Sequence, residues 1–459
     1  MMLAAAWVAP MSAAAPQLLR EGAVVFAGGH IIAVGPRRQL QREHPNVVVQ
    51  DLGDAVILPG LVNAHVHLEL SDAVPGPRPA GGFGEWLLAM VRRGGTRTAE
   101  QVAAAVEAGV AQCLRFGVTS VGDISRVCGV SRGILQQSLL NAVSYGEVAG
   151  MGKRRGQMEG LLDAAIRPPL PPGERWGEGR DEKRFTREIG HPTPGPHPNP
   201  LAGSRRIRSL LPEGEGTRGR FPTSLSDLSI GITPHAPYSI EPDGYQRCLA
   251  VARERDLPLA THLAESADEA VFLAQHTGPL RQLWALLDGW DEHVPRFAGG
   301  PIRYAQALGL LNYPTLLAHV NYCDDDEMEI LARGKASVVY CPRTHAYFGH
   351  PPHRWREMLA RGINVAVGTD SCASSPDLNL VDDLRLMHRI APDVPAEVLW
   401  RMATINAATA IGQAERVGSL QVGKRADVVV FKAGGENPLA EILESGARPV
   451  EVWCDGVLH

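Results

Sequence analysis

Residues 57–69 read Ile57-Leu58-Pro59-Gly60-Leu61-Val62-Asn63-Ala64-His65-Val66-His67-Leu68-Glu69, an apolar run that ends in two histidines one residue apart. Such a run is typical of a strand buried in a parallel sheet. Alternate side chains of a strand share a face, so His65 and His67 point the same way. Two imidazoles at the end of a buried strand are either core histidines or half of a metal site. The rest of the chain has to decide between the two.

The overall composition is that of an ordinary globular protein. Of 459 residues, 44% are hydrophobic and 21% are charged, and the net charge of -5 favours neither nucleic acid nor an anionic membrane as a partner. The seven cysteines form no Cys-x-x-Cys pair, which favours a reducing compartment over a cysteine-based zinc module. No apolar run approaches the roughly 18 residues of a membrane span. The alanine-rich N-terminus lacks the basic start of a signal peptide, so we expect a cytoplasmic protein.

Both ends of the chain show short strand patterns separated by tight turns. The patterns lie at residues 23–26, 31–34 and 47–49, and again at 426–431 and 450–456. Each end alone is too small to bury its own core. We therefore predict one small β-sandwich-like domain composed of residues 1–56 and 415–459.

The middle of the chain, residues 57–414, alternates strand patterns with helical patterns, as in α/β proteins. We expect eight strands, at residues 56–61, 117–124, 142–146, 229–234, 258–261, 315–318, 336–341 and 364–368. Eight strand–helix repeats predict a (β/α)8 barrel of the TIM type.

One segment interrupts this alternation. Residues 167–222 contain 11 Pro and 9 Gly among 56 residues and few large apolar side chains. They cannot bury enough surface to offset their ordering entropy, so we predict a disordered insertion after the third strand. Its arginines leave open a contact with an anionic partner, but a solvated insertion without a function is the favoured interpretation.

Polar residues follow the expected strands, where a (β/α)8 barrel carries its reacting groups. The strand ends carry His65 and His67, Asp123, Glu147, His235, His262 with Glu265, His319, His345, and Asp370. Alone, each could be structural; Asp370, for example, could cap the following helix. Together, His65, His67, His262 and Asp370 supply three nitrogens and one oxygen, which suits Zn2+ or another divalent cation with one position left for water.

Three of these residues are candidates for acid–base catalysis. A divalent cation makes water reactive at neutral pH, and Asp370 can take the proton from that water. Glu265, three residues after His262, can protonate a ring nitrogen and then the leaving group; alternatively it is a first-turn glutamate that favours the helix dipole. His319 can orient the water and stabilise developing negative charge.

The ordered set of motifs resembles the amidohydrolase superfamily, in its branch of metal-dependent hydrolytic deaminases and chlorohydrolases of nitrogen heterocycles. The motifs are Pro59-Gly60-Leu61-Val62-Asn63-Ala64-His65-Val66-His67, Pro234-His235-Ala236-Pro237-Tyr238-Ser239, Thr261-His262-Leu263-Ala264-Glu265-Ser266, Leu317-Ala318-His319, Gly368-Thr369-Asp370 and Gly423-Lys424-Arg425-Ala426-Asp427. The resemblance covers nearly the whole chain except residues 150–225. It implies one metal ion, Zn2+ with Fe2+ as the alternative, held by His65, His67, His262 and Asp370. It also implies catalytic roles for Glu265, His319 and Asp370.

The resemblance also implies contacts with the substrate. In adenosine-type deaminases of this branch, the histidine of the His-Ala-Pro-Tyr-Ser motif contacts substrate, which here is His235. A glutamate before tryptophan in the first long loop binds ribose hydroxyls, which here is Glu85, although a loop-packing role is equally open. The segment after the seventh strand departs from the usual pattern and resembles bacterial aminodeoxyfutalosine deaminases. In it, Arg343, His345 and His350 are further candidates for substrate binding, and each could equally pack within the loop.

We therefore expect hydrolytic deamination of an aminopurine nucleoside-like small molecule with release of ammonia. Aminodeoxyfutalosine is the first choice, and 5′-methylthioadenosine or S-adenosylhomocysteine comes next. The same residues could displace chloride or open a cyclic amide or amidine, so another hydrolase of the superfamily is the alternative. A non-catalytic barrel is the remote alternative. We expect no nucleic acid or membrane partner and leave a homo-oligomer open.

Overall fold

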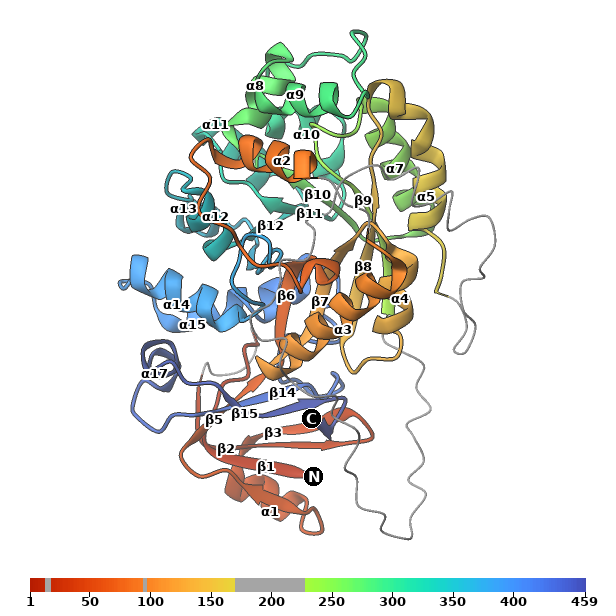
Figure 1. Cartoon of the computed structure of the whole chain (residues 1–459). Coiled ribbons are helices and arrows are strands. Elements are labelled where there is room, and N and C mark those ends of the chain that lie inside the picture. The colour runs from red at the N-terminus through yellow and green to blue at the C-terminus, as the bar shows by residue number, and fades with distance from the viewer. Residues whose placement is uncertain (13–17, 94–96, 170–227) are drawn as a thin grey trace.

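The computed structural model describes residues 1–12, 18–93, 97–169 and 228–459. Its strands form two sheets of eight strands each. One sheet is built from both ends of the chain and lies below the other, which carries the alternating middle of the chain (Figure 1). Most of the predicted insertion, residues 167–222, lies outside the described residues.

The upper sheet is a nearly closed barrel of parallel strands in chain order. Its strands are β6 (Leu61–Val66), β7 (Val118–Ser125), β8 (Asn141–Val148), β9 (Leu228–Pro234), β10 (Leu259–Leu263), β11 (Thr315–His319), β12 (Ser337–Tyr340) and β13 (Val365–Val367). The last strand closes on the first through a bridge between Val66 and Asp370, where the Asp370 N–H donates to the His65 carbonyl at 3.0 Å. The predicted (β/α)8 barrel is confirmed.

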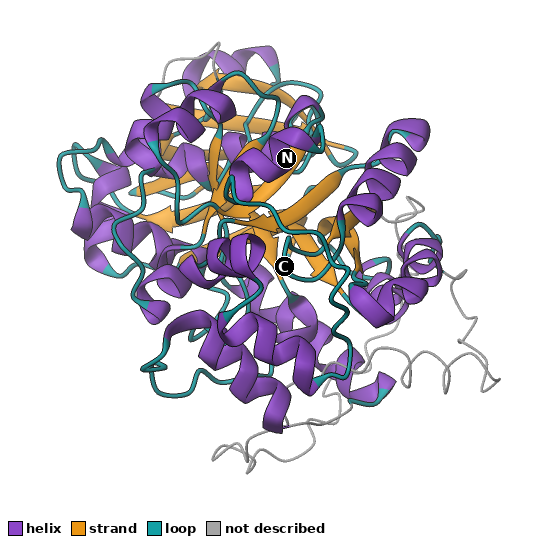
Figure 2. Cartoon of the chain, turned by 90° about the horizontal axis from the view of Figure 1, so that it is seen from above, coloured by secondary structure: helices purple, strands orange, loops and turns teal. Residues whose placement is uncertain are grey.

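Helices surround the barrel strands, as the view from above shows (Figure 2). The α-helices between and after the strands are α2 (Gly82–Arg93), α3 (Ala99–Arg115), α4 (Cys128–Leu135), α5 (Met158–Ala165), α7 (Pro242–Arg255), α8 (Ala267–Gln275), α9 (Gly278–Leu286), α10 (Pro301–Ala307), α11 (Asp325–Ala332), α12 (Pro342–Phe348), α13 (Trp355–Ala360), α14 (Leu380–Ile390), α15 (Ala396–Met402) and α16 (Ile405–Ala410). Short 3-10 turns are η1 (Leu68–Leu70), η2 (Gly152–Gln157) and η3 (Leu310–Asn312). Helix α16 packs small side chains, Ala407 and Ala408, against the apolar interior of the barrel. It thereby covers the end at which β13 begins, so the opposite end is the one left for a site.

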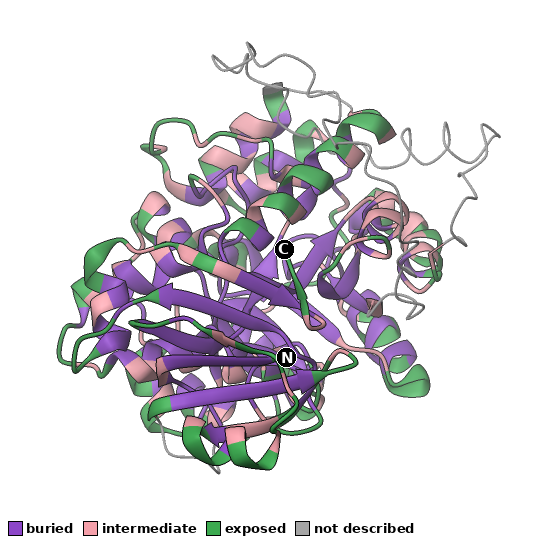
Figure 3. Ribbon diagram, turned by 90° about the horizontal axis from the view of Figure 1, so that it is seen from below, coloured by how far each residue is buried: buried purple, intermediate pink, exposed green. Residues whose placement is uncertain are grey.

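The terminal sheet joins segments that are far apart in the sequence. Its strands are β1 (Met2–Val8), β2 (Leu19–Ala27), β3 (His30–Pro36), β4 (Val49–Asp51), β5 (Ala55–Pro59), β14 (Val428–Lys432), β15 (Pro449–Cys454) and β16 (Val457–Leu458), with α1 (Arg37–Glu43) and α17 (Pro438–Ser445) beside them. Strand β5 pairs with β14 from the other end of the chain. Most strand residues of this sheet are buried (Figure 3). The predicted composite β-domain is confirmed, while its division at residues 56 and 415 stays a prediction.

Seven of the eight expected barrel strands lie within two residues of the observed ones, and the first expected strand is wrong. Residues 55–59 pair with β1 and β14 in the terminal sheet, and the first barrel strand begins at Leu61. The chain passes between the two sheets at Gly60, whose N–H donates to the Asp427 carbonyl at 2.9 Å. A Cβ at Gly60 would lie 2.1 Å from Thr119 Oγ1, so the crossing requires glycine.

Among the described residues, no helix combines the length and the apolar character needed to cross a membrane.

Candidate metal centre and active site

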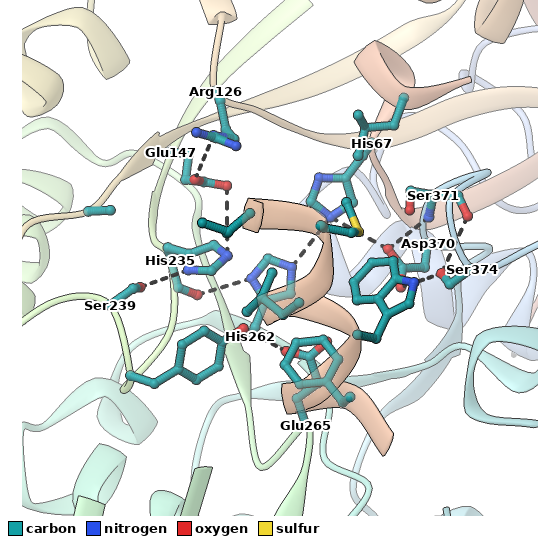
Figure 4. A pocket seen from close by; sticks show the side chains of 18 of the residues that line it. His67, Arg126, Glu147, His235, Ser239, His262, Glu265, Asp370, Ser371 and Ser374 are labelled. Carbon is teal, nitrogen blue, oxygen red and sulfur yellow. Dashed lines mark hydrogen bonds and ion pairs between the residues drawn. The ribbon is translucent and has the colours of Figure 1, made fainter. Parts of the chain in front are cut away.

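Five polar side chains converge where β6, β10, β11 and β13 end. The candidate ligand atoms of His65, His262 and His319 lie within 4.8 Å of one another, as do those of His65, His67 and Asp370. His67 Nε2 lies 3.4 Å from His262 Nε2 and 3.6 Å from Asp370 Oδ1. The structure thus brings together all four residues expected as ligands, with His319 beside them (Figure 4 shows His67, His262 and Asp370).

The environment of the cluster keeps its imidazoles neutral. Burial lowers the pKa of His65 and of His67 well below its usual value, and the neighbouring histidines lower it further. Burial lowers the pKa of His262 to about 3. The His262 Nδ1–H donates to the His235 carbonyl at 3.0 Å, so the lone pair lies on His262 Nε2. A neutral imidazole with a free Nε2 is the form that binds a metal ion.

His65 provides the test of whether these residues fit a metal ion. It is fully buried, and neither of its ring nitrogens has a hydrogen-bond partner within the described part of the chain. A buried polar group without a partner costs about 1–3 kcal/mol. A cation bound at His65 Nε2 would remove that cost at this atom. Three imidazoles and one carboxylate are a donor set that zinc prefers, so the residues present fit the expected divalent metal.

The carboxyl group of Glu265 is buried beside this cluster. Glu265 Oε2 accepts the Tyr238 hydroxyl at 2.9 Å, and Oε1 lies 3.5 Å from His319 Nε2. Burial raises the pKa of Glu265 well above its usual value, and the nearby Asp370 and Glu269 raise it further. A raised pKa makes Glu265 hold a proton more strongly than an exposed glutamate does, so it is a candidate for the acid.

Asp370 is a buried carboxyl group at the end of β13. Burial raises the pKa of Asp370 to about 7. Hydrogen bonds oppose this rise: the Ser371 N–H donates to Oδ1 at 2.7 Å, and the Ser374 hydroxyl donates to Oδ2 at 3.3 Å. Both carboxylate oxygens of Asp370 thus accept a hydrogen bond from the segment that follows β13.

Several residues at these strand ends have backbone conformations that side chains rarely adopt. The φ angle is positive at Ala264 (50°), His319 (77°), Val320 (49°) and Asp370 (57°). In β6 the register against β7 shifts between Asn63 and Val66. A positive φ angle in a residue other than glycine costs about 1–3 kcal/mol. Such residues, and register shifts in strands, both cluster at functional sites. None of these residues is glycine, so sequence patterns carried no signal of the strain.

A cavity opens in front of the cluster, with an empty volume of about 1070 Å³ counted out to its mouth. The polar lining residues are His67, Glu69, Arg126, Glu147, His235, Tyr238, Ser239, His262, Glu265, His319, Asp370, Ser371 and Ser374. The apolar lining residues are Leu70, Phe83, Trp86, Leu87, Met90, Val91, Ala149, Leu283, Trp284 and Phe348. The lining therefore combines polar side chains with aromatic and aliphatic ones.

The residues expected to bind substrate divide into two groups. His235 lines the cavity, and its Nδ1 lies 2.7 Å from Ser239 Oγ. Glu85 is exposed on α2 and is not among the described residues that line the cavity, although Phe83 and Trp86 beside it are. The ribose-binding role expected for Glu85 therefore stays a prediction.

Arg343 and His345 are also absent from the described cavity lining. Arg343 forms ion pairs with Asp377 at 2.7 Å and with Asp383 at 2.9 Å, which tie α12 to the segment before α14 and to α14 itself. His345 Nε2–H donates to the Pro351 carbonyl at 2.8 Å. Both side chains are engaged in holding the loop after β12, which sequence reasoning could not distinguish from substrate binding. Sequence reasoning also missed Arg126, which follows β7 directly.

This arrangement is typical of barrel hydrolases that hold a metal ion at the barrel mouth. It combines a (β/α)8 barrel, a cluster of His and Asp at the strand ends, and the buried acid Glu265. Comparison with protein families gives the particular family: residues 56–144 and 224–458 match the amidohydrolase family, and the chain belongs to it. Residues 22–46 match an imidazolonepropionase-like composite domain of bacteria. The expected enzyme class, a hydrolase of carbon–nitrogen bonds of the hydrolytic deaminase type, is confirmed.

Three similar proteins illustrate the relationship. The 5-methylthioadenosine/S-adenosylhomocysteine deaminase of Nitratidesulfovibrio vulgaris is 28% identical over 434 residues, covering 92% of this chain and 81% of the relative. The aminodeoxyfutalosine deaminase of Deinococcus radiodurans is 28% identical over 411 residues, covering 85% of this chain and 81% of the relative. The crystal structure of an adenosine deaminase from Xanthomonas campestris with bound zinc superposes with a TM-score of 0.71 at 22% identity, covering 100% of this chain and 92% of that one. At this identity the crystal structure supports the fold alone.

Proposed function

We propose that the protein hydrolytically deaminates an aminopurine nucleoside-like substrate and releases ammonia. Aminodeoxyfutalosine is the first substrate to test, followed by 5′-methylthioadenosine and S-adenosylhomocysteine. The observation that carries the proposal is the group His65, His67 and Asp370 beside His262, with the buried carboxyl of Glu265, whose pKa is raised well above its usual value, at the same cavity. Relatives that share 28% identity carry these deaminase names, which supports the choice of substrates.

The metal is proposed to be Zn2+, held by His65, His67, His262 and Asp370. The donor set of neutral imidazoles and a carboxylate supports this choice. When bound, the metal supplies a water molecule activated for attack at neutral pH.

The protein's own groups then handle the protons. Tyr238 donates to Glu265 Oε2, which leaves Oε1 to carry the proton that passes to the ring nitrogen beside the amine. Protonation of that nitrogen makes the adjacent ring carbon electrophilic. Asp370, whose Oδ1 lies 3.6 Å from His67 Nε2, takes a proton from the attacking water and passes it to the departing amine. His319, neutral because burial lowers its pKa, uses its unpaired Nε2 to orient the attacking water.

The test is a panel of compounds assayed for ammonia release by the purified protein. The panel contains the three named substrates, adenosine, a chlorotriazine and a lactam. We expect turnover of at least one aminopurine nucleoside, loss of that activity with a chelator and its return with Zn2+. Turnover of the chlorotriazine or lactam alone would show a different hydrolase.

Metal analysis separates the enzyme from a non-catalytic barrel. We expect the purified protein to bind Zn2+ tightly and the His67→Ala variant to lose both the metal and the activity. A protein that binds no Zn2+, and in which His67→Ala changes nothing, would be a barrel without catalysis.

A further inference from the structure

One buried histidine after β12 has no part in the proposed proton transfers. Residues 349–354, which we call the histidine loop, join α12 to α13. In this loop His353 is buried, and its Nε2–H donates to the His319 carbonyl at 2.9 Å. Burial lowers the pKa of His353 to about 3, so the ring is neutral and carries its proton on the nitrogen that faces a carbonyl oxygen. The ring therefore acts on His319 as a hydrogen-bond donor.

The bond to His319 distinguishes this imidazole from a ring that only packs. His353 stacks on Tyr340 with the ring centroids 4.2 Å apart, a contact that phenylalanine could also make. Its Nδ1 has no hydrogen-bond partner within the described part of the chain, which is unfavourable for a buried polar atom. Among the contacts of the described residues, the bond to His319 is thus the one that needs a donor at this position.

The backbone that accepts this bond has an unfavourable conformation. Residues 319–322, which we call the catalytic turn, follow directly on β11 and begin with positive φ angles at His319 (77°) and Val320 (49°). Residues other than glycine keep such angles only where their surroundings hold them. The Val320 N–H donates to the Leu263 carbonyl at 2.9 Å, so the end of β10 holds one amide of the turn. His353 holds the carbonyl of its first residue.

The catalytic turn sets the geometry of two catalytic side chains. His319 Nε2 has no hydrogen-bond partner among the described residues and lies 3.5 Å from Glu265 Oε1. Asn321 Nδ2 donates to the Glu265 carbonyl at 2.9 Å. At the far end of the turn, Tyr322 Oη lies 3.1 Å from His350 Nδ1, so the histidine loop contacts both ends. A displacement of the turn would therefore move His319 relative to Glu265.

We propose that the histidine loop clamps the catalytic turn, and that His353 is a positioning residue that keeps the His319 ring at the cavity beside Glu265. The proposal rests on the part that His319 plays in the deamination proposed above. The loop is itself braced, because the His345 Nε2–H donates to the Pro351 carbonyl at 2.8 Å. The histidines of this unusual segment thus act on the catalytic groups from behind the cavity and need no contact with substrate.

The test compares three substitutions of His353 that differ in the donor they offer. The amide nitrogen of His353→Gln falls near the position of Nε2, that of His353→Asn is too short to reach it, and His353→Phe keeps the ring alone. Displacing a reacting group by about 1 Å can cost about 100-fold in rate, so kcat of H353N and H353F should fall by about 10- to 100-fold. H353Q restores the donor and should keep kcat within about 3-fold of wild type. KM and the bound Zn2+ should stay unchanged in all three variants.

A matched control and a measurement without substrate accompany the kinetics. The Tyr313 hydroxyl donates to the Leu257 carbonyl at 2.9 Å near the other end of β11, so Tyr313→Phe also removes a side-chain donor to the backbone and should keep the wild-type kcat. Hydrogen–deuterium exchange, followed by mass spectrometry, reports on the catalytic turn directly. The amides of residues 320–321 should exchange about 2- to 10-fold faster in H353N than in wild type, the factor for one hydrogen bond, and at the wild-type rate in Y313F.

Each outcome decides the assignment. Unchanged kcat in H353N and H353F, an equal loss in H353Q and H353N, or the same loss in Y313F would overturn the clamp, as would a loss explained by KM or by missing Zn2+. If the wild type turns over no aminopurine nucleoside, the proposed function fails separately, and equal exchange of residues 320–321 in wild type and H353N would overturn the clamp by itself. Should the His353 variants not fold, as judged by circular dichroism, His350→Phe breaks the second contact and should speed the same exchange; unchanged exchange would then count against the clamp.

Discussion

Replacement of Asn63 by alanine should loosen the metal centre without removing a ligand. Asn63 is fully buried in β6; its Nδ2 donates to Thr369 Oγ1 at 2.8 Å, and its Oδ1 accepts the Thr369 N–H at 3.1 Å. These two bonds join the first and last strands of the barrel next to His65 and Asp370. They help to set the distance between His65 Nε2 and Asp370 Oδ1, which is 3.8 Å.

The size of the effect follows from these two bonds. The loss of two buried hydrogen bonds costs about 1–3 kcal/mol, and the Thr369 N–H left without a partner adds about 1–3 kcal/mol. The free energy of unfolding of Asn63→Ala should therefore fall by about 2–6 kcal/mol. Groups that orient metal ligands change metal affinity by about 10–100-fold, so Zn2+ binding should weaken by at least about 10-fold.

The assay compares urea unfolding of the metal-free protein with Zn2+ competition against a chelator. Asn364→Ala is the matched control, because the Asn364 side chain also donates two hydrogen bonds, to Ser337 Oγ at 2.9 Å and to the Asn406 carbonyl at 3.0 Å. These bonds lie at the other end of the strands from the metal centre. Both variants should lose stability, and only Asn63→Ala should lose Zn2+ affinity. Unchanged Zn2+ affinity in Asn63→Ala, or an equal loss in both variants, would refute the reasoning.

Three further predictions concern the same end of the barrel. Glu265→Gln should lower kcat by about 10²–10⁴-fold while leaving the bound Zn2+ unchanged, as steady-state kinetics and metal analysis can show; a near-normal kcat would remove Glu265 as the acid. A Cβ at Gly368 would lie 2.8 Å from the His65 carbonyl oxygen, so Gly368→Ala should cost about 1–3 kcal/mol in urea unfolding, unlike Gly133→Ala, which meets nothing within 4 Å. Burial raises the pKa of Glu269 from 4.5 to about 8, so its contribution to stability is complete below about pH 4.5 and is lost as the pH rises through about 8. Glu269→Gln should flatten this decline in urea unfolding between pH 5 and 8, and parallel curves for the two proteins would contradict it.

The barrel was predictable because its signal is local. Each strand is a short apolar run, and each is followed within a few residues by the polar group that it presents at its end. Parallel strands of a barrel have their carboxyl ends at one rim, so His65, His262 and Asp370 could be placed at one centre although they are far apart in the sequence. The structure brings their ligand atoms together in just this way.

The crossing at Gly60 was not predictable, because it depends on distant partners. Residues 55–66 form one apolar pattern, and only the pairing of β5 with β14 divides it between two sheets. Arg343 shows the same limit for side chains. Its position after a barrel strand indicated substrate binding, whereas Asp377 and Asp383, 34 and 40 residues away in the sequence, hold it within the protein.

The three glutamates of the cavity illustrate why residue type alone does not assign a role. Glu265 accepts one hydroxyl and is buried, which raises the pKa of its carboxyl well above the usual value. Glu69 accepts three protein donors and anchors the turn after β7. Glu147 Oε1 lies 3.4 Å from Arg126 Nε, so an ion pair accompanies this carboxylate. The donors and counter-charges that distinguish the three glutamates lie 21–58 residues from each of them in the sequence. Substitution by glutamine should accordingly affect kcat at Glu265 and stability at Glu69, and equal effects on one parameter at both positions would contradict this division.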